Sequence, residues 1–173
     1  MIFAPDVFLT GEFGAAKPMP ISGTYAGYTF GYNRPLVAQR VHDILTAVTT
    51  VKYARLFHTV HLVGWEKAGP WVVLARGLCG DAVARTAADI NGFRFEKVAA
   101  IADEMMLPGA AKYGGLPALA ALVAPGELSI HNNRGTGMGQ WLKAAYAAAG
   151  AADHLHTSGD KLEAEKVAEW LVR

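Results

Sequence analysis

The sequence has a single cysteine and little charge of either sign. With Cys79 alone, no disulfide forms within the chain, and a lone thiol is typical of a reducing compartment. The 16 Lys and Arg residues nearly balance the 15 Asp and Glu residues, which gives a net charge of +1 and no basic surface for nucleic acid. We therefore expect a cytoplasmic protein without a nucleic-acid partner.

Long apolar runs are also missing. The runs at 69–78 and 116–125 span about ten residues, roughly half of what a membrane-crossing helix needs. The N-terminus lacks the basic segment, apolar stretch and cleavage site of a signal peptide, so we expect no membrane association. Apolar residues nevertheless make up 52% of the 173 positions, which predicts one well-packed domain over residues 1–173.

Strand and helix patterns alternate along the chain. Short apolar or β-branched runs predict strands at 1–8, 59–63, 82–90, 128–131 and 153–157. Apolar residues at helical spacing predict helices at 34–53, 70–78, 140–149 and 162–172, with two or three short helices within 95–123. This alternation predicts a three-layer α/β fold, in which helices cover about five mostly parallel strands.

The most informative stretch is 58–78, where a strand, a tight turn and a helix follow one another. Gly64 and Gly69 bracket the turn, and Pro70 suits the first turn of a helix. In α/β-hydrolases such a turn is the nucleophile elbow, written G-x-S-x-G, which exposes a serine above the sheet. Here residues 64–69 read GWEKAG, so Glu66 occupies the serine position.

The order of these elements resembles the C-terminal two thirds of an α/β-hydrolase of the acetylxylan-esterase and dienelactone-hydrolase branch. Asp6, followed by Leu-Thr-Gly at 9–11, is similar to that branch's segment after its fourth strand. Arg40 and Asp43 are similar to its Arg and Asp on the helix before the elbow. The resemblance covers almost the whole chain, but the family's first three strands have no counterpart. It implies hydrolysis of carboxylic esters or lactones.

Carried over residue by residue, the resemblance implies an altered catalytic set. The family's nucleophile falls on Glu66, and its histidine, which lies after the last strand, falls on His156. Its acid would follow the strand at 128–131, where no carboxylate is present, and Asp103 is the candidate replacement. The N–H of Lys67 supplies one oxyanion donor, while the second donor has no counterpart, a loss of about 3 kcal/mol of transition-state stabilisation.

Three further residues are candidates for substrate contact: Trp65, His131 and Asn132. A carboxylate in a partly buried turn needs an opposite charge to offset its lost hydration. We therefore expect Lys67 to pair with Glu66 or with a neighbouring carboxylate.

We expect neither a metal nor a cofactor. His58 and His61 have the spacing HxxH, which in a strand places them on opposite faces. The sequence GTGMG at 135–139 precedes a helix and is similar to a phosphate-binding loop, but it does not follow the first strand.

Two functions stay open. Because three of the four catalytic parts are lost or altered, the first is a hydrolase-like protein with a degenerate site that acts as a binding or interaction module. The second is a small active hydrolase of esters or lactones that uses Glu66 with His156. A small acyl compound is the ligand that the resemblance implies.

We also expect a homo-oligomer. A parallel sheet is normally apolar on both faces, and the missing third strand removes a helix that would cover one of them. A symmetric dimer would bury this face. The alternative cover is the loop at 9–33, which is rich in glycine, proline and aromatic residues.

Overall fold

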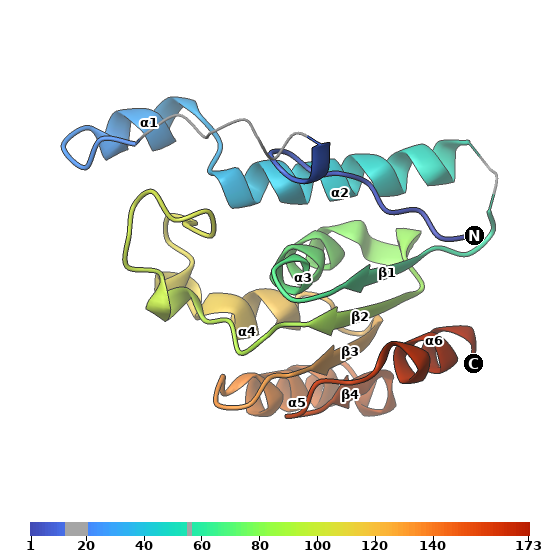
Figure 1. Cartoon of the computed structure of the whole chain (residues 1–173). Coiled ribbons are helices and arrows are strands. Elements are labelled where there is room, and N and C mark those ends of the chain that lie inside the picture. Colours follow the sequence, from blue (N-terminus) through green and yellow to red (C-terminus); the bar gives the residue numbers. More distant parts are fainter. Residues whose placement is uncertain (13–20, 55–56) are drawn as a thin grey trace.

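A parallel sheet lies at the centre of the computed structural model, which describes residues 1–12, 21–54 and 57–173. In these residues the sheet has four strands in the order β1-β2-β3-β4: β1 (His61–Gly64), β2 (Arg85–Asp89), β3 (Glu127–His131) and β4 (Leu155–Thr157) (Figure 1). The α-helices are α1 (Ala26–Tyr32), α2 (Leu36–Tyr53), α3 (Ala68–Cys79), α4 (Gly115–Ala121), α5 (Met138–Ala148) and α6 (Ala164–Val172). Short 3₁₀ turns lie at Gly80–Ala82, Phe95–Lys97, Ala111–Tyr113 and Ala152–His154. The predicted α/β class is confirmed.

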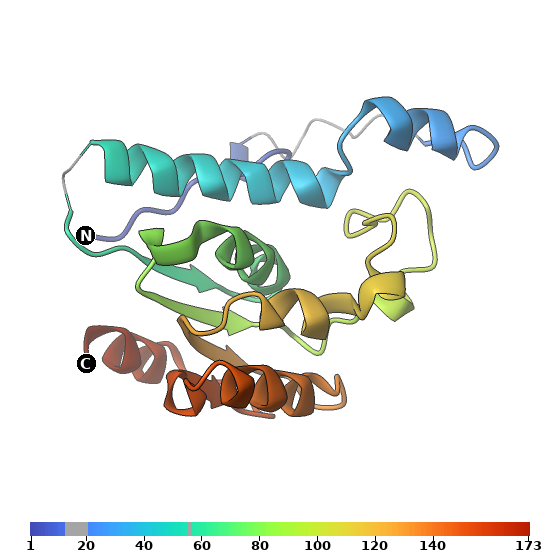
Figure 2. The same cartoon turned by 180° about the vertical axis from the view of Figure 1, so that it is seen from behind.

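The strand order explains why α3, α4 and α5 lie on one face of the sheet. Each connection moves one way along the sheet, and successive right-handed crossovers that do so stay on the same side. Leu128 and Ile130 of β3 accordingly share a buried cluster with Val73, Leu116 and Leu142 from these three helices. Figure 2 shows the helices in front of the strands.

The opposite face of the sheet is largely polar and lies under α6. Arg85 of β2 donates a hydrogen bond of 2.8 Å to the carbonyl oxygen of Trp170 in α6, and the ring of His156 in β4 lies against the same Trp170. Val63 is 40% exposed there. The other strand residues of this face are small or polar: His61, Ala87, Asp89, Glu127, Ser129 and His131. The broad apolar face from which we predicted a dimer is therefore not found on this side.

Residues 1–8 do not form the predicted strand, so the expected number of about five strands is corrected to four. The segment runs along α2, where the Asp43 carboxylate accepts a hydrogen bond of 2.8 Å from the N–H of Phe8. Arg40 Nε donates to the Phe8 carbonyl oxygen at 3.2 Å, and Val7 is buried in the cluster around α2. Side chains of a helix thus satisfy backbone groups that a neighbouring strand would otherwise bind.

Most other predicted elements are present with shifted ends. β2 begins at Arg85 rather than at the predicted residue 82, because Gly80–Ala82 form a 3₁₀ turn. Helix α3 begins two residues before Pro70. The predicted loop at 9–33 contains α1, while its residues 13–20 lie outside the described part of the chain. Within the described ranges, no helix combines the length and the apolar character that a membrane crossing needs.

Candidate functional site

The turn after β1 places Glu66 in a left-handed backbone conformation. Glu66 has a φ of 52°, which costs an ordinary residue roughly 1–2 kcal/mol. The N–H groups of Ala68 and Gly69 donate to the carbonyl oxygens of Trp65 and Glu66, which joins the turn to α3. A Cβ atom on Gly69 would lie 1.8 Å from the Asp89 carbonyl oxygen, so only glycine fits there. Glu66 therefore sits on the predicted strand–turn–helix.

Glu66 pairs with a lysine that follows β4, at the other edge of the sheet. Lys161 Nζ lies 3.1 Å from Glu66 Oε1 and 3.5 Å from Asp89 Oδ2. The hydrogen bond to Glu66, together with the attraction of both carboxylates, raises the pKa of Lys161. The lysine therefore remains a protonated cation between two carboxylates at neutral pH.

Asp89 is the buried member of this group. It ends β2 with no exposed surface, and its Oδ1 accepts hydrogen bonds from the Asn91 N–H and from Asn132 Nδ2 at 2.9 and 2.8 Å. Its Oδ2 has no hydrogen-bond partner among the described residues. Because a buried charge is costly unless it is paired, Lys161 supplies the compensation that Asp89 needs. Both groups lie at the carboxyl edge of the sheet, where open α/β sheets bind ligands.

The predicted substrate contacts are grouped near this edge. The rings of Trp65 and His131 meet edge to face, with centroids 5.4 Å apart. His131 is buried, and its Nδ1 accepts a hydrogen bond of 3.2 Å from the Leu162 N–H, so the ring proton of the neutral form lies on Nε2. Burial lowers the pKa of His131, with Lys161 adding to the effect and Asp89 opposing it. This histidine is therefore neutral at pH 7. Asn132, as described above, binds Asp89.

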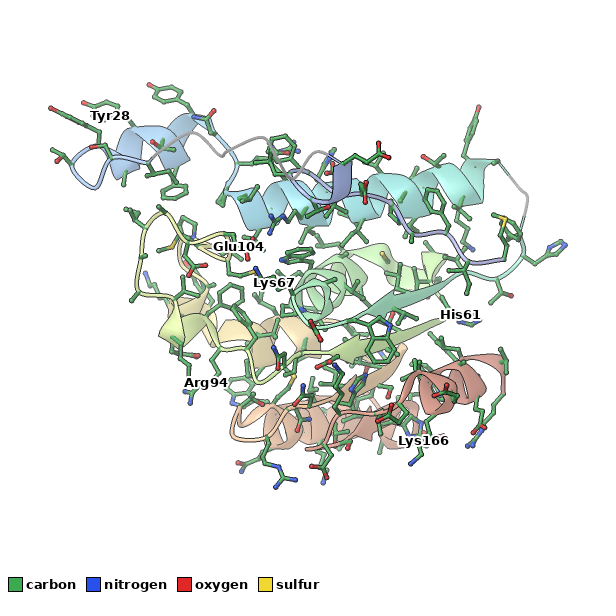
Figure 3. All side chains as sticks on the ribbon, in the orientation of Figure 1. Tyr28, His61, Lys67, Arg94, Glu104 and Lys166 are labelled. Carbon is green, nitrogen blue, oxygen red and sulfur yellow. The ribbon has the colours of Figure 1, made fainter. Side chains whose placement is uncertain are left out.

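Lys67 pairs with Glu104, and Figure 3 shows these two side chains near each other. Lys67 Nζ lies 2.8 Å from Glu104 Oε1, and the other oxygen of Glu104 lies 2.8 Å from Arg40 on α2. The Arg40 guanidinium is buried and stacks 4.4 Å from the centre of the Trp71 ring. Burial alone would raise the pKa of Glu104, but the hydrogen bonds from Lys67 and Arg40 outweigh it and hold that pKa below its usual range. Lys67 thus pairs with a neighbouring carboxylate, one of its two expected partners.

The other two predicted catalytic residues make their contacts elsewhere. His156 lies within β4 rather than after it, with its ring 5.5 Å from that of Trp170. Asp103 accepts a hydrogen bond of 2.8 Å from the Met105 N–H and so closes a local turn. Among the interactions of the described residues, neither side chain hydrogen-bonds to Glu66.

Sequence reasoning missed Asp89 and Lys161, although each carried a signal. Asp89 is a charged residue near the end of an apolar strand, and such ends meet at one edge of a parallel sheet. Lys161 follows the last strand, which is where the resemblance puts the family's histidine. His156 matches the family's residue type, whereas Lys161, five positions later, matches only its place in the chain.

The Lys161 ammonium gives this group a hydrogen-bond donor between two carboxylates. A protonated lysine donates hydrogen bonds but accepts no proton, and Glu66 has no neutral nitrogen base among its hydrogen-bond partners in the described residues. In the same ranges, no three His, Cys, Asp or Glu side chains come together as metal ligands.

Comparisons with protein-family models, with curated proteins and with solved structures find no match for this chain. Its function must therefore be argued from its own residues, above all from those that surround Glu66.

Proposed function

We propose that this protein is a hydrolase-like binding module, in which Glu66, Lys161 and Asp89 occupy the place of a catalytic set. The observation that carries the proposal is the Lys161 ammonium, held between the two carboxylates at 3.1 and 3.5 Å. A histidine in that place would accept a proton near neutral pH. A lysine with a raised pKa does not, which favours binding without turnover.

The ligand that this geometry favours is a small acyl compound with a carboxylate or carbonyl oxygen. Lys161 is half exposed and offers an ammonium group to such an oxygen. The N-terminus of α3 starts beside Glu66 and adds its positive dipole end. The partly exposed Trp65 ring, backed by the buried His131 ring, provides an apolar surface for the rest of the ligand.

The proposal predicts binding of short carboxylic acids without hydrolysis of their esters. In a titration followed by NMR, amide signals around Glu66 should shift with butyrate, and the shift should be lost in Lys161→Met. Lys166→Met, on α6, is the matched control and should bind as wild type does. Hydrolysis of p-nitrophenyl butyrate or of a short acyl lactone that disappears in Glu66→Ala would contradict the proposal.

One observation favours the second function, a small hydrolase of esters or lactones. Glu66 keeps a strained left-handed backbone, and such strain is concentrated at functional sites. In this hypothesis the Glu66 carboxylate attacks the acyl carbon, and the alcohol leaves with a proton from solvent. His156, once it has left Trp170, then deprotonates the water that hydrolyses the resulting anhydride and restores the Glu66 carboxylate. Turnover would then fall in His156→Ala as well as in Glu66→Ala. Loss in the Glu66 variant alone would exclude the role of His156.

A further inference from the structure

Helices α2, α3 and α4 form an apolar groove of about 480 Å³ that the candidate site does not use. Most of its lining is aliphatic, including Val41, Leu45, Leu74, Leu78, Leu119 and Leu122. Leu78 and Leu122 are 67% and 62% exposed. Arg34 and His42 are the titratable residues of the lining. A groove of exposed leucines with so little charge is typical of a docking surface.

Helix α1 is an uncharged aromatic segment with little packing of its own. Its sequence is AGYTFGY, and Ala26 is the buried residue that it contributes. Tyr25, Tyr28 and Tyr32 are 61%, 69% and 87% exposed. All three figures place α1 beyond the first turn of α2 and away from the sheet. Figure 3 shows Tyr28 toward the outer end of this helix.

We propose that α1 of a second copy of this chain occupies the groove, and that the exchange is reciprocal. The chemistry of the two surfaces matches, because uncharged aromatic rings meet aliphatic side chains. Burial of three tyrosines and the facing groove in each copy would cover roughly 1,000–1,500 Å² in total, close to the size of a standard specific interface.

The position of α1 also fits a closed dimer. Only three residues, at 33–35, separate α1 from α2, and α2 lines the groove from its first turns onward. The docking helix and the groove therefore lie at the same end of the molecule. A two-fold axis near that end lets each copy give and receive one helix, so the assembly closes as a dimer instead of growing into a fibre.

Sedimentation equilibrium of the full chain tests the proposal. From low to high micromolar concentration, wild type should pass from a monomer to twice the mass of one chain. The groove variant Leu78→Glu/Leu122→Glu and the helix variant Tyr28→Asp/Tyr32→Asp should each weaken the dimer at least about tenfold. Tyr53→Ser, 88% exposed at the far end of α2, is the control and should dimerise as wild type does. Circular dichroism checks that each variant is folded.

Mixing the two double variants separates this arrangement from any other dimer. The groove variant still carries an intact α1, and the helix variant still carries an intact groove, so the mixture should form a dimer with one intact contact. A wild type that remains monomeric, a dimer that survives both double variants, or a mixture that stays monomeric would overturn the proposal. A monomer whose own α1 folds into its own groove falls under the first of these outcomes.

Discussion

Two ion-pair networks meet at the elbow, and they have opposite polarity. Glu66 belongs to a network with a buried anion, Asp89, and a half-exposed cation, Lys161. The next residue, Lys67, belongs to a network with a buried cation, Arg40, and a partner, Glu104, that is about one third exposed. Both follow the same rule, since a charge out of water needs an opposite charge or several hydrogen bonds.

The networks differ in how completely the buried group is bonded. Arg40 donates to the Phe8 carbonyl oxygen and to Glu104, and its flat face lies on Trp71. Asp89, by contrast, leaves Oδ2 without a hydrogen bond in the described residues. The first network therefore holds the N-terminal segment, α2 and α3 together. The second leaves its buried acceptor only a 3.5 Å ion pair with the half-exposed ammonium of Lys161, and this difference separates scaffold from candidate site.

The largest effect is expected from Asp89→Ala. The change removes a buried side chain and leaves the Asn91 N–H and Asn132 Nδ2 without their acceptor, so unfolding should become easier by about 3 kcal/mol. Urea denaturation measures the loss. Asp89→Asn keeps an oxygen for both donors and should cost less. An equal cost for both variants would show that charge, rather than these hydrogen bonds, is what holds this region.

Arg40→Met should lower the free energy of unfolding by about 2 kcal/mol. Methionine keeps the apolar packing of the side-chain stem but loses the bonds to Phe8 and Glu104. The residues before α2 should then become more accessible, which hydrogen exchange can detect. Arg134→Met, whose side chain is 75% exposed, is the control and should stay within about 0.5 kcal/mol. If Arg40→Met lowers the free energy of unfolding no more than the control does, the Arg40 network does not stabilise the fold.

Glu104→Gln should lower the free energy of unfolding by about 1 kcal/mol at neutral pH. The effect is this small because Glu104 is partly exposed, so that solvent screens its two ion pairs. The folded state holds the pKa of Glu104 below its unfolded value, so this stabilisation is present above about pH 4.3 and is lost as the pH falls through the folded value. Melting curves of both proteins should therefore converge in acid. A difference in melting temperature between wild type and variant that persists at low pH would show that packing, rather than charge, causes the effect.

The smallest effect is expected from Lys161→Met, and it should appear on the alkaline side. Because folding raises the pKa of Lys161, its contribution is present below its unfolded value of about 10.4 and is lost as the pH rises through the folded value. The wild type and the variant should differ slightly in melting temperature at neutral pH and converge in strong alkali. If Lys166→Met behaves in the same way, the effect belongs to net charge and not to the pair with Glu66.

Local signals predicted the fold better than they predicted the site. Gly64 and Gly69 marked the elbow, because a turn and a close backbone approach depend on residues next to each other in the chain. The strand prediction for residues 1–8 is wrong because the same apolar pattern suits both a strand and an extended segment that packs on a helix. Lys161 lies 95 positions from Glu66, so only the return of β4 to the sheet brings the two together.

The close contact at Gly69 fixes how α3 sits against the end of β2. With no room for even a methyl group between them, neither element can slide without displacing the other. The residues that carry Lys161 are anchored to the sheet as well, because the Asn132 N–H donates to the Asp160 carbonyl oxygen and the Leu162 N–H donates to His131 Nδ1. Glu66, Asp89 and Lys161 are therefore held by backbone segments that are all fixed at one edge of the sheet, so the sheet itself sets the spacing of the three charges.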